Sequence, residues 1–285
     1  MNLLRKGLNA FQIKIIALAF MTIDHIGVYQ ILSNNNAVND MLRVLGRIAA
    51  PLFLFLLIEG LRHTRSKRNY IIRLYVAAVM IQIANRLFMK YIATGYFSPL
   101  SNNLPTFMYT ALFIVLIEAL IDAIRKNERL GGFLLIITMM IPFVFVPVYN
   151  YSLENSCEVL ATFIEVLAPS LFTVEYSFIF VLLGIAWYFV NNKVHNCLIF
   201  AILCMFSFII PSDWFFGSPI IALRPIFFNP VVLFTSTQWC MVLAIPFMLL
   251  YNGEKGRSCK YLFYLYYPLH QYFFFILQLS VIQKQ

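Results

Sequence analysis

Charged residues are scarce in this chain. Asp, Glu, Lys and Arg make up only 12% of its 285 residues, whereas 61% are hydrophobic and the mean hydropathy is +0.80. That charged share is about half of what a globular domain carries. A water-soluble fold cannot bury so much apolar surface, but a bilayer can surround it. The composition excludes a soluble globular protein and predicts an integral membrane protein.

Motifs of metal and nucleotide chemistry are missing. The chain has no C-x-x-C pair, no H-E-x-x-H, no Walker loop and no G-x-G-x-x-G, and its cysteines lack zinc-ligand spacing. We therefore expect no metal site. The five cysteines are interpreted as fillers of the core or of lipid-facing surfaces: Cys157, Cys197, Cys204, Cys240 and Cys259.

Acidic residues are the rarest charged group, 12 against 21 basic ones, which gives a net charge of +9. In a soluble protein that excess would suggest nucleic acid. Here the basic residues lie in short loops between apolar runs, so we expect them to set membrane orientation, with no nucleic-acid partner. A second role in binding an anionic ligand or membrane lipid headgroups stays open.

Long apolar runs fill the rest of the sequence. A membrane helix needs about 20 mostly apolar residues, and nine segments qualify. They predict an all-α, polytopic transmembrane helix bundle of about nine spans, with a range of eight to eleven, in a single integral membrane domain, 1–285. The nine segments are 11–32, 42–61, 70–92, 104–124, 131–150, 174–190, 196–211, 237–251 and 261–281.

Three features qualify this count. The amphiphilic stretch 155–173 is interpreted as a re-entrant or interfacial helix, and the proline-broken stretch 218–234 is similarly ambiguous. The first run lacks a small-x-small cleavage site before Leu32, so it is interpreted as a retained span. With the N-terminus in the cytoplasm and the C-terminus outside, 15 of the 21 basic residues fall on the inner side.

Ionisable residues within a span are costly, roughly 3 kcal/mol each on insertion scales, and mark functional positions by default. The first span carries Asp24 and His25 in FMTIDHIGVY. Lys14, almost three helical turns earlier, lies on roughly the same face as His25. A neutral imidazole can take a proton near pH 7, so His25 is a candidate base. The alternative is a buried histidine satisfied by a neighbouring carboxylate.

The second span also holds polar groups. Arg47 is expected below the outer interface, Pro51 is expected to kink the helix, and Glu59 and His63 are four residues apart at the cytoplasmic end. An alternative role for Arg47 is an ion pair with Asp24 that only joins two helices.

The loop after this span, RHTRSKRNYIIR, carries five cations in 12 residues. Such a loop suits a phosphate-rich cytoplasmic ligand. The alternative is a topology signal with lipid headgroups as counterions. The cations are Arg62, Arg65, Lys67, Arg68 and Arg73.

The last span contains YLFYLYYPLHQYFFF. Tyr264, Tyr267 and Gln271 form one polar stripe, bordered by His270, and Pro268 loosens the backbone beside them. A site and a buried polar seam explain this stripe equally well. Two other polar groups are interpreted as mostly structural: Gln82, Asn85 and Arg86 in the third span, and Glu118 and Asp122 at the end of the fourth.

Three stretches resemble the TraX family of membrane acetyltransferases: IKIIALAFMTIDHIG, GRIAAPLFLFLLIEGLRHTRSKRNYIIRL, and YNGEKG through FYLYYPLH. The central region matches only as generic apolar spans. The resemblance carries over these positions: Asp24, His25, Gly46, Arg47, Pro51, Glu59, Gly60, Thr64, Tyr70, Arg73, Tyr267, Pro268 and His270.

This resemblance implies an enzyme in a bacterial inner membrane that moves acetyl from cytoplasmic acetyl-CoA to an unknown acceptor, a peptide N-terminus or a glycan. It implies His25 as base, with Asp24, Arg47, Tyr267 and His270 supporting it. Acetyl-CoA phosphates would meet the cationic loop. The competing functions are a transporter or flippase and a non-catalytic membrane assembly factor. The residues implied for acetyl-CoA are Arg62, His63, Arg65, Lys67, Arg68, Tyr70 and Arg73.

Overall fold

The computed structural model describes residues 7–32, 35–92, 100–154, 157–168, 171, 174, 177–209, 238–257 and 260–282. These residues are helical apart from turns, loops and one isolated bridge between Leu8 and Tyr251. The expected all-α class is therefore confirmed. The ambiguous stretch 218–234 lies outside the described residues.

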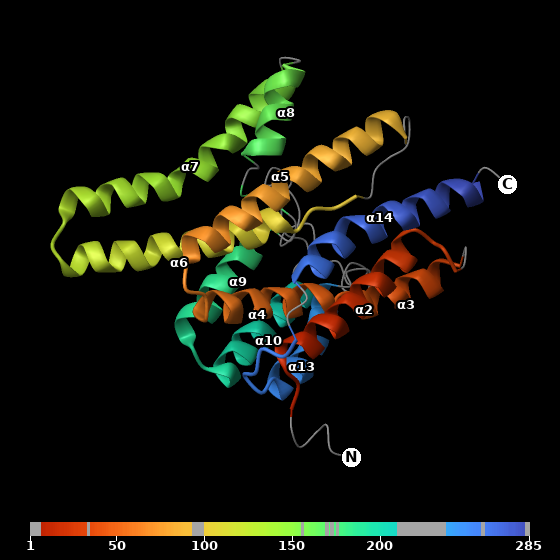
Figure 1. Ribbon diagram of the computed structural model, residues 1–285, viewed down its shortest axis with the longest axis horizontal. Helices are drawn as coiled ribbons and strands as arrows, with labels where there is room; N and C mark the ends of the chain where they lie inside the picture. Colours follow the sequence, from red (N-terminus) through yellow and green to blue (C-terminus); the bar gives the residue numbers. More distant parts are fainter. Residues whose placement is uncertain are drawn as a thin grey trace. The chain divides into compact units, whose positions relative to one another are not determined.

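The chain divides into two compact units. Figure 1 labels their helices. Unit 1 holds both ends of the chain and unit 2 the middle, with α4 beginning in the first and ending in the second. The elements of unit 1 are α2 (Ala10–Val28), α3 (Asn36–Gly46), α4 (Ala49–Arg62), α10 (Lys193–Ile209), the 3-10 helix η2 (Gln238–Ala244), α13 (Ile245–Leu250) and α14 (Lys260–Ile282). Unit 2 contains α5 (Lys67–Tyr91), α6 (Leu104–Arg125), α7 (Arg129–Glu154), α8 (Glu158–Leu167) and α9 (Ser177–Val190).

Within the described residues, four helical segments are long and apolar enough to cross a membrane: Ala10–Val28, Asn36–Arg62, Lys67–Tyr91 and Leu104–Arg125. They correspond to the first four predicted spans. The next four predicted spans coincide with shorter apolar helices, Arg129–Phe145, Phe178–Val190, Lys193–Ser207 and Gln238–Leu250. The ninth coincides with α14. The protein is thus a membrane protein, while the total of nine spans stays a prediction.

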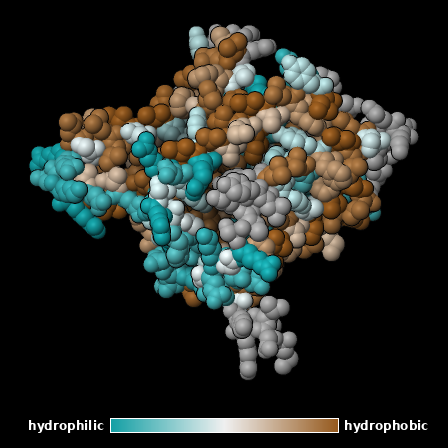
Figure 2. Space-filling view, viewed as in Figure 1, coloured by the Kyte–Doolittle hydropathy of each residue, from teal (hydrophilic) through white to brown (hydrophobic). Residues whose placement is uncertain are grey.

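The surface of unit 2 shows why these helices need lipid. Along α7, Leu130, Phe133, Ile137 and Ile141 are all exposed, Phe133 by 60%. Figure 2 shows a hydrophilic tip on the hairpin of α6 and α7, with hydrophobic surface behind it. A water-exposed protein rarely presents such a contiguous apolar patch, whereas a lipid-facing helix does.

The second predicted span is broken. The sequence predicted one helix over 42–61, with a kink at Pro51. Instead α3 ends at Gly46, a turn follows, and α4 begins at Ala49. Pro51 explains the position of the break, because its missing N–H would have bonded to the carbonyl of Arg47. Arg47 therefore caps α3 and lies at the break rather than within a continuous helix.

The start of α2 is held by the loop that follows α13. Leu8 N donates to Leu250 O at 2.7 Å, Asn252 N donates to Leu8 O at 2.9 Å, and Ala10 N donates to Glu254 O at 2.8 Å. Gly256 has φ +66°, and a Cβ there would lie 2.6 Å from Asn9 Oδ1. We call these contacts between residues 7–10 and 250–256 the clamp. They give the YNGEKG stretch a structural role, which is to fix the start of the first span.

The N-terminus of α2 is also capped within its own sequence. Asn9 Oδ1 accepts from the backbone N–H of Gln12 at 2.9 Å, and Gln12 Oε1 accepts from Asn9 N at 2.9 Å. This reciprocal arrangement is a capping box, which satisfies two N–H groups that a helix start leaves without partners. Local sequence and the clamp therefore fix the same helix end.

Candidate functional site

Two glycines bring α2 and α3 into close contact in unit 1. A Cβ at Gly27 would lie 2.8 Å from the carbonyl oxygen of Asn39. A Cβ at Gly46 would overlap the side chain of Asp24. Small residues at such a crossing let two helix backbones approach closely within a membrane. This approach places the break at Arg47 next to Asp24.

Asp24 and Arg47 form the ion pair that the sequence offered as an alternative for Arg47. Arg47 Nη2 lies 3.4 Å from Asp24 Oδ1, and their side chains are 11% and 18% exposed, respectively. Asp24 Oδ1 and Arg47 Nε have no hydrogen-bond partner within the described part of the chain. Arg47 therefore joins the two helices while keeping one buried donor for another acceptor.

Two histidines from opposite ends of the chain meet in the same unit. His25 on α2 and His270 on α14 are both buried, 8% and 6% exposed. Their ring centroids are 4.6 Å apart at an interplanar angle of 82°. The Nε2 atom of His270 lies 3.4 Å from the Nδ1 atom of His25. The structure thus brings together two residues that the sequence placed in one site.

Backbone carbonyls assign the protons of both rings. The Nδ1 atom of His25 lies 2.8 Å from Met21 O, and that of His270 lies 2.8 Å from Tyr266 O. A carbonyl oxygen only accepts, so each Nδ1 carries the proton in the neutral ring. The lone pair of His270 Nε2 then faces the same Nδ1–H of His25, which Met21 O already accepts at the shorter distance. The Nε2 atom of His25 keeps its own lone pair for a proton from elsewhere.

Aromatic residues enclose this pair. Tyr266 stacks on His270 with a centroid distance of 5.1 Å and an angle of 8°. Tyr29 stacks on His25 at 6.1 Å and is itself only 1% exposed. The ring of Tyr267 lies 6.2 Å from that of His270. The pair is therefore held between rings rather than open to lipid.

The sequence missed Thr22, Tyr29 and Tyr266. Thr22 Oγ1 donates to Leu18 O at 2.8 Å, so its oxygen accepts from the Tyr266 hydroxyl at 2.5 Å, which ties α2 to α14. Tyr29 follows His25 by four residues and Tyr266 precedes His270 by four. The i, i+4 rule would have found both tyrosines. The side chain of Tyr264, which the sequence placed in the polar stripe, lies outside the described side chains.

Charged side chains lie close to His25 within unit 1. Asp24, which precedes His25 on α2, pairs with Arg47. Lys14, on the same helix, has its Nζ 5.4 Å from the ring centroid of Phe263 on α14. The candidate site in unit 1 therefore comprises a histidine pair, a neighbouring ion pair and an aromatic cage.

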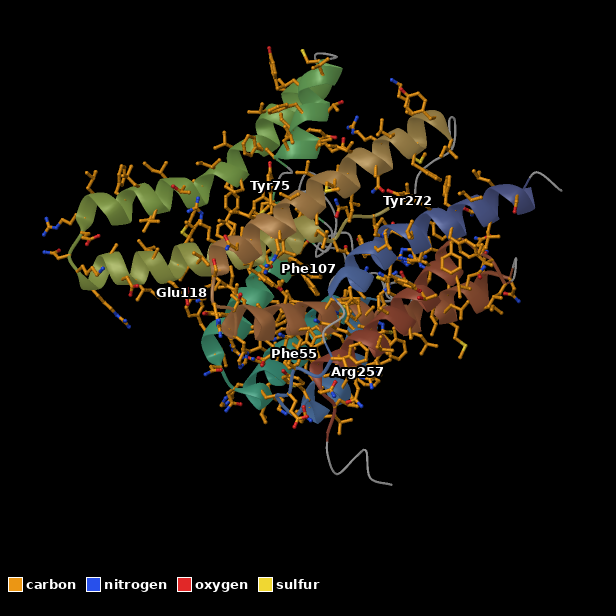
Figure 3. All side chains as sticks on the ribbon, in the orientation of Figure 1. Phe55, Tyr75, Phe107, Glu118, Arg257 and Tyr272 are labelled. Carbon is orange, nitrogen blue, oxygen red and sulfur yellow. The ribbon has the colours of Figure 1, made fainter. Side chains whose placement is uncertain are left out.

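The cationic loop belongs to unit 2, and two of its charges bind protein groups. Lys67 Nζ lies 2.6 Å from Glu118, which projects from α6 (Figure 3), and 2.7 Å from the Tyr188 hydroxyl. Arg62 Nη2 donates to the carbonyls of Trp187 at 2.6 Å and Tyr188 at 3.0 Å, where α9 ends. Lys67 thus connects α5 to α6 and α9, and Arg62 caps the C-terminal end of α9.

The remaining loop residues are more exposed. Arg65 and Arg68 are exposed and form no ion pair with any described residue. Arg73 is exposed and lies over the Tyr70 ring at 5.8 Å, and His63 is exposed as well. A Cβ at Gly60 would lie 3.4 Å from the Tyr70 hydroxyl, so that glycine makes room for the tyrosine. Arg65, Arg68 and Arg73 are the cations that an anionic ligand can reach.

Cysteine and metal chemistry have no support in the described residues. Cys197, Cys204 and Cys240 are buried and Cys157 is exposed, and all four are free thiols. No described group of three or more His, Cys, Asp or Glu side chains is arranged to hold a metal ion. Cys259 lies outside the described residues.

Comparisons with known proteins identify a family for this chain. A family model described as TraX protein matches residues 10–278. A probable fimbrial assembly protein, FimC of serogroup H1 from Dichelobacter nodosus, is 38% identical over 74 residues. That match covers 26% of this chain and 30% of the relative. No solved structure matches.

Proposed function

Because this chain belongs to the TraX family, we propose that it is a membrane-bound acetyltransferase. It would move acetyl from acetyl-CoA to an amine or hydroxyl of a membrane-associated or exported acceptor. The observation that supports this most is the buried contact between His25 and His270. A base in a water-poor site can take a proton from an acceptor without competing with bulk solvent.

His25 Nε2 is the proposed base. The acceptor nitrogen or oxygen attacks the thioester carbonyl while its proton passes to this lone pair. The new C–N or C–O bond forms, the C–S bond breaks, and the proton leaves with the CoA thiol. Met21 O accepts the Nδ1–H of His25 at 2.8 Å and holds the ring in place. The lone pair of His270 Nε2, 3.4 Å from the same nitrogen, stabilises the imidazolium that forms, as a positioning partner does in other base-assisted sites.

Arg47 is the proposed stabiliser of the developing oxyanion. Its Nε donor is buried and has no partner in the described part of the chain, while Asp24 holds the other side of its guanidinium. A fixed donor of this kind contributes most where charge develops in a low-dielectric site. Tyr267 stays a second candidate for this role.

Arg65, Arg68 and Arg73 are the proposed contacts of the acetyl-CoA phosphates. They are exposed, and they need only place cationic donors around an anion. Arg62 and Lys67 support the loop from inside unit 2 through their contacts with α6 and α9. His63 and Tyr70 complete the loop, Tyr70 by its ring beneath Arg73.

The relative from Dichelobacter nodosus suggests one class of acceptor. That relative is named a probable fimbrial assembly protein, so a peptide of a pilus system is one candidate acceptor. A glycan is the other.

Two measurements test the proposal. Isothermal titration of the purified, folded protein should show acetyl-CoA binding above that of a CoA-free buffer. Mass spectrometry of cells with and without the protein should then show a component that loses the mass of one acetyl group when the protein is absent. Folded protein that does not bind acetyl-CoA would contradict the proposal and favour a transporter or an assembly factor.

A further inference from the structure

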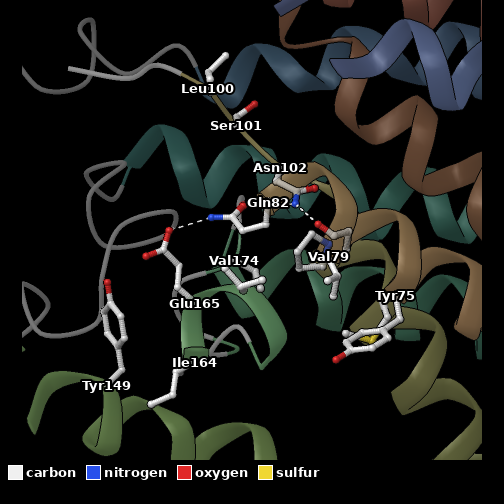
Figure 4. A pocket seen from close by; sticks show the side chains of 14 residues that line it. Tyr75, Val79, Gln82, Leu100, Ser101, Asn102, Tyr149, Ile164, Glu165 and Val174 are labelled. Atoms are coloured by element: carbon white, nitrogen blue, oxygen red, sulfur yellow. Dashed lines mark hydrogen bonds between the residues drawn. The ribbon is translucent and has the colours of Figure 1, made fainter. Parts of the chain in front are cut away.

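A cavity of about 300 Å³ lies within unit 2, and none of the residues that line it is assigned above to acetyl transfer. Its walls come from α5, α6, α7, α8 and the segment before α6 (Figure 4). This volume is at the small end of the range for small-molecule sites, roughly 300–1,000 Å³. The polar residues in its wall are Tyr75, Gln82, Ser101, Asn102, Tyr149 and Glu165.

A chain of hydrogen bonds builds the polar wall. Asn102 Nδ2 donates to Ala78 O at 2.9 Å and approaches Gln82 Oε1 at 3.4 Å. Gln82 Nε2 donates to Glu165 Oε1 at 2.8 Å, the bond drawn in Figure 4. Three separate elements therefore fix the orientation of the side-chain amides and the carboxylate.

The charge of this wall is balanced. Glu165 is the only lining residue with a formal charge, and its Oε2 pairs with Arg86, which does not line the cavity. Arg86 Nη1 also donates to Thr162 Oγ1 at 3.0 Å, so Arg86 on α5 binds two residues of α8, Thr162 and Glu165. An additional cation or anion would leave an uncompensated charge in a membrane domain, which is costly. The cavity therefore favours an uncharged ligand.

The groups that face the cavity can both donate and accept. Tyr149 points from α7 toward Glu165 in Figure 4, and its hydroxyl has no hydrogen bond to any described residue. Ser101 adds a second hydroxyl, and Gln82 and Asn102 add amides. Tyr75 and Tyr149 also supply flat apolar ring faces.

We propose that this cavity binds the ring of a neutral sugar. A sugar carries hydroxyls that donate and accept around its edge and apolar C–H groups on its faces, which matches the hydroxyls, amides and tyrosine rings of the wall. A fatty acyl chain would leave the Tyr149 hydroxyl without a hydrogen-bond partner, at about 1–3 kcal/mol. The inference does not depend on acetyl transfer, because no residue assigned to acetyl transfer lines the cavity.

Ligand-observed NMR on the full chain in phosphatidylethanolamine and phosphatidylglycerol nanodiscs tests this. Those lipids lack sugar headgroups, and sugar-based detergents must be avoided. The probes share one ring: N-acetylglucosamine and glucose as neutral sugars, glucosamine as the amine, and glucose 6-phosphate as the anion. We expect saturable binding of a neutral sugar and weaker binding of the two charged probes. Added acetyl-CoA should not change the binding of any probe.

Variants identify the site. Tyr149→Phe removes one hydroxyl and should weaken sugar binding about 5- to 10-fold, the effect of one hydrogen bond. Tyr151→Phe, on the same helix and 62% exposed, should leave it unchanged. Ser101→Trp, which fills the cavity from a non-helical segment, should abolish it. Absent or non-saturable binding, tighter binding of a charged probe, or unchanged binding by Ser101→Trp would each overturn the proposal.

Discussion

The Nε2 atom of His270 lies 3.4 Å from the Nδ1 atom of His25, across 245 residues of sequence. The two rings belong to the first and last helices of the described chain. Each ring donates from Nδ1 to a carbonyl four residues before it in its own helix. These carbonyls therefore fix the tautomer of each ring. The nitrogen of His25 that keeps a lone pair, and is the proposed base, is Nε2.

Replacing His25 should remove catalysis but not donor binding. We expect His25→Gln to lower the rate of acetyl transfer by about 10²- to 10⁴-fold, the usual contribution of a general base. The acetyl-CoA Kd should not change, because the phosphates bind elsewhere. Titration and single-turnover assays measure the two effects. His195→Gln, an exposed histidine on α10, is the matched control, and full turnover by His25→Gln would end the assignment.

Replacing His270 should act through His25. His270→Phe keeps a ring against Tyr266 but removes the acceptor that faces His25. We expect kcat to fall about tenfold or more while KM changes little, because the interaction strengthens as His25 gains a proton. His270→Gln offers an oxygen acceptor and should recover part of the loss. Equal effects on kcat and KM, without rescue, would indicate a purely structural role.

Reversing the exposed loop charges should weaken donor binding. The triple variant Arg65→Glu, Arg68→Glu, Arg73→Glu should raise the acetyl-CoA KM at least tenfold, and high salt should reduce the difference because exposed charges are screened. The double variant Lys126→Glu, Arg129→Glu changes exposed cations at the turn between α6 and α7 and serves as a control. An unchanged KM would restrict this loop to setting topology.

Adding one methyl group to Gly46 should destabilise the protein. A Cβ there would overlap Asp24, so α2 and α3 must separate, at a cost of about 1–3 kcal/mol. The thermal midpoint of Gly46→Ala in detergent should fall. Gly132→Ala places its Cβ 3.6 Å from Leu120, an ordinary contact, and should be neutral or stabilising, since alanine favours helix. Equal midpoints would show that this crossing tolerates a side chain.

Composition and hydropathy were enough for the all-α membrane class, because the cost of exposing apolar surface to water does not depend on tertiary detail. The limits of most helices followed from apolar runs. The break at Arg47 was placed four residues late, at Pro51, since the missing N–H of a proline acts on the carbonyl of the preceding turn. The two compact units reflect contacts between distant segments, which no local pattern reports.

The site was predictable where a residue type is expensive in a membrane. Asp24, His25 and Arg47 stood out in the sequence for that reason, and the structure brings them together in unit 1. The contact between His25 and His270 could not be derived from spacing, since 245 residues separate them. Likewise, Lys67 looked like a free cation, because nothing in the sequence indicates that Glu118 and Tyr188 will meet it.

The clamp between residues 7–10 and 250–256 bears on how the molecule is made. A chain emerging from the ribosome delivers α2, with Asp24 and His25 in it, well before the loop that fixes its start. The clamp and α14, with His270, are both synthesised long after α2. The polar residues of α2 therefore stay unmatched by α14 until that helix has been made.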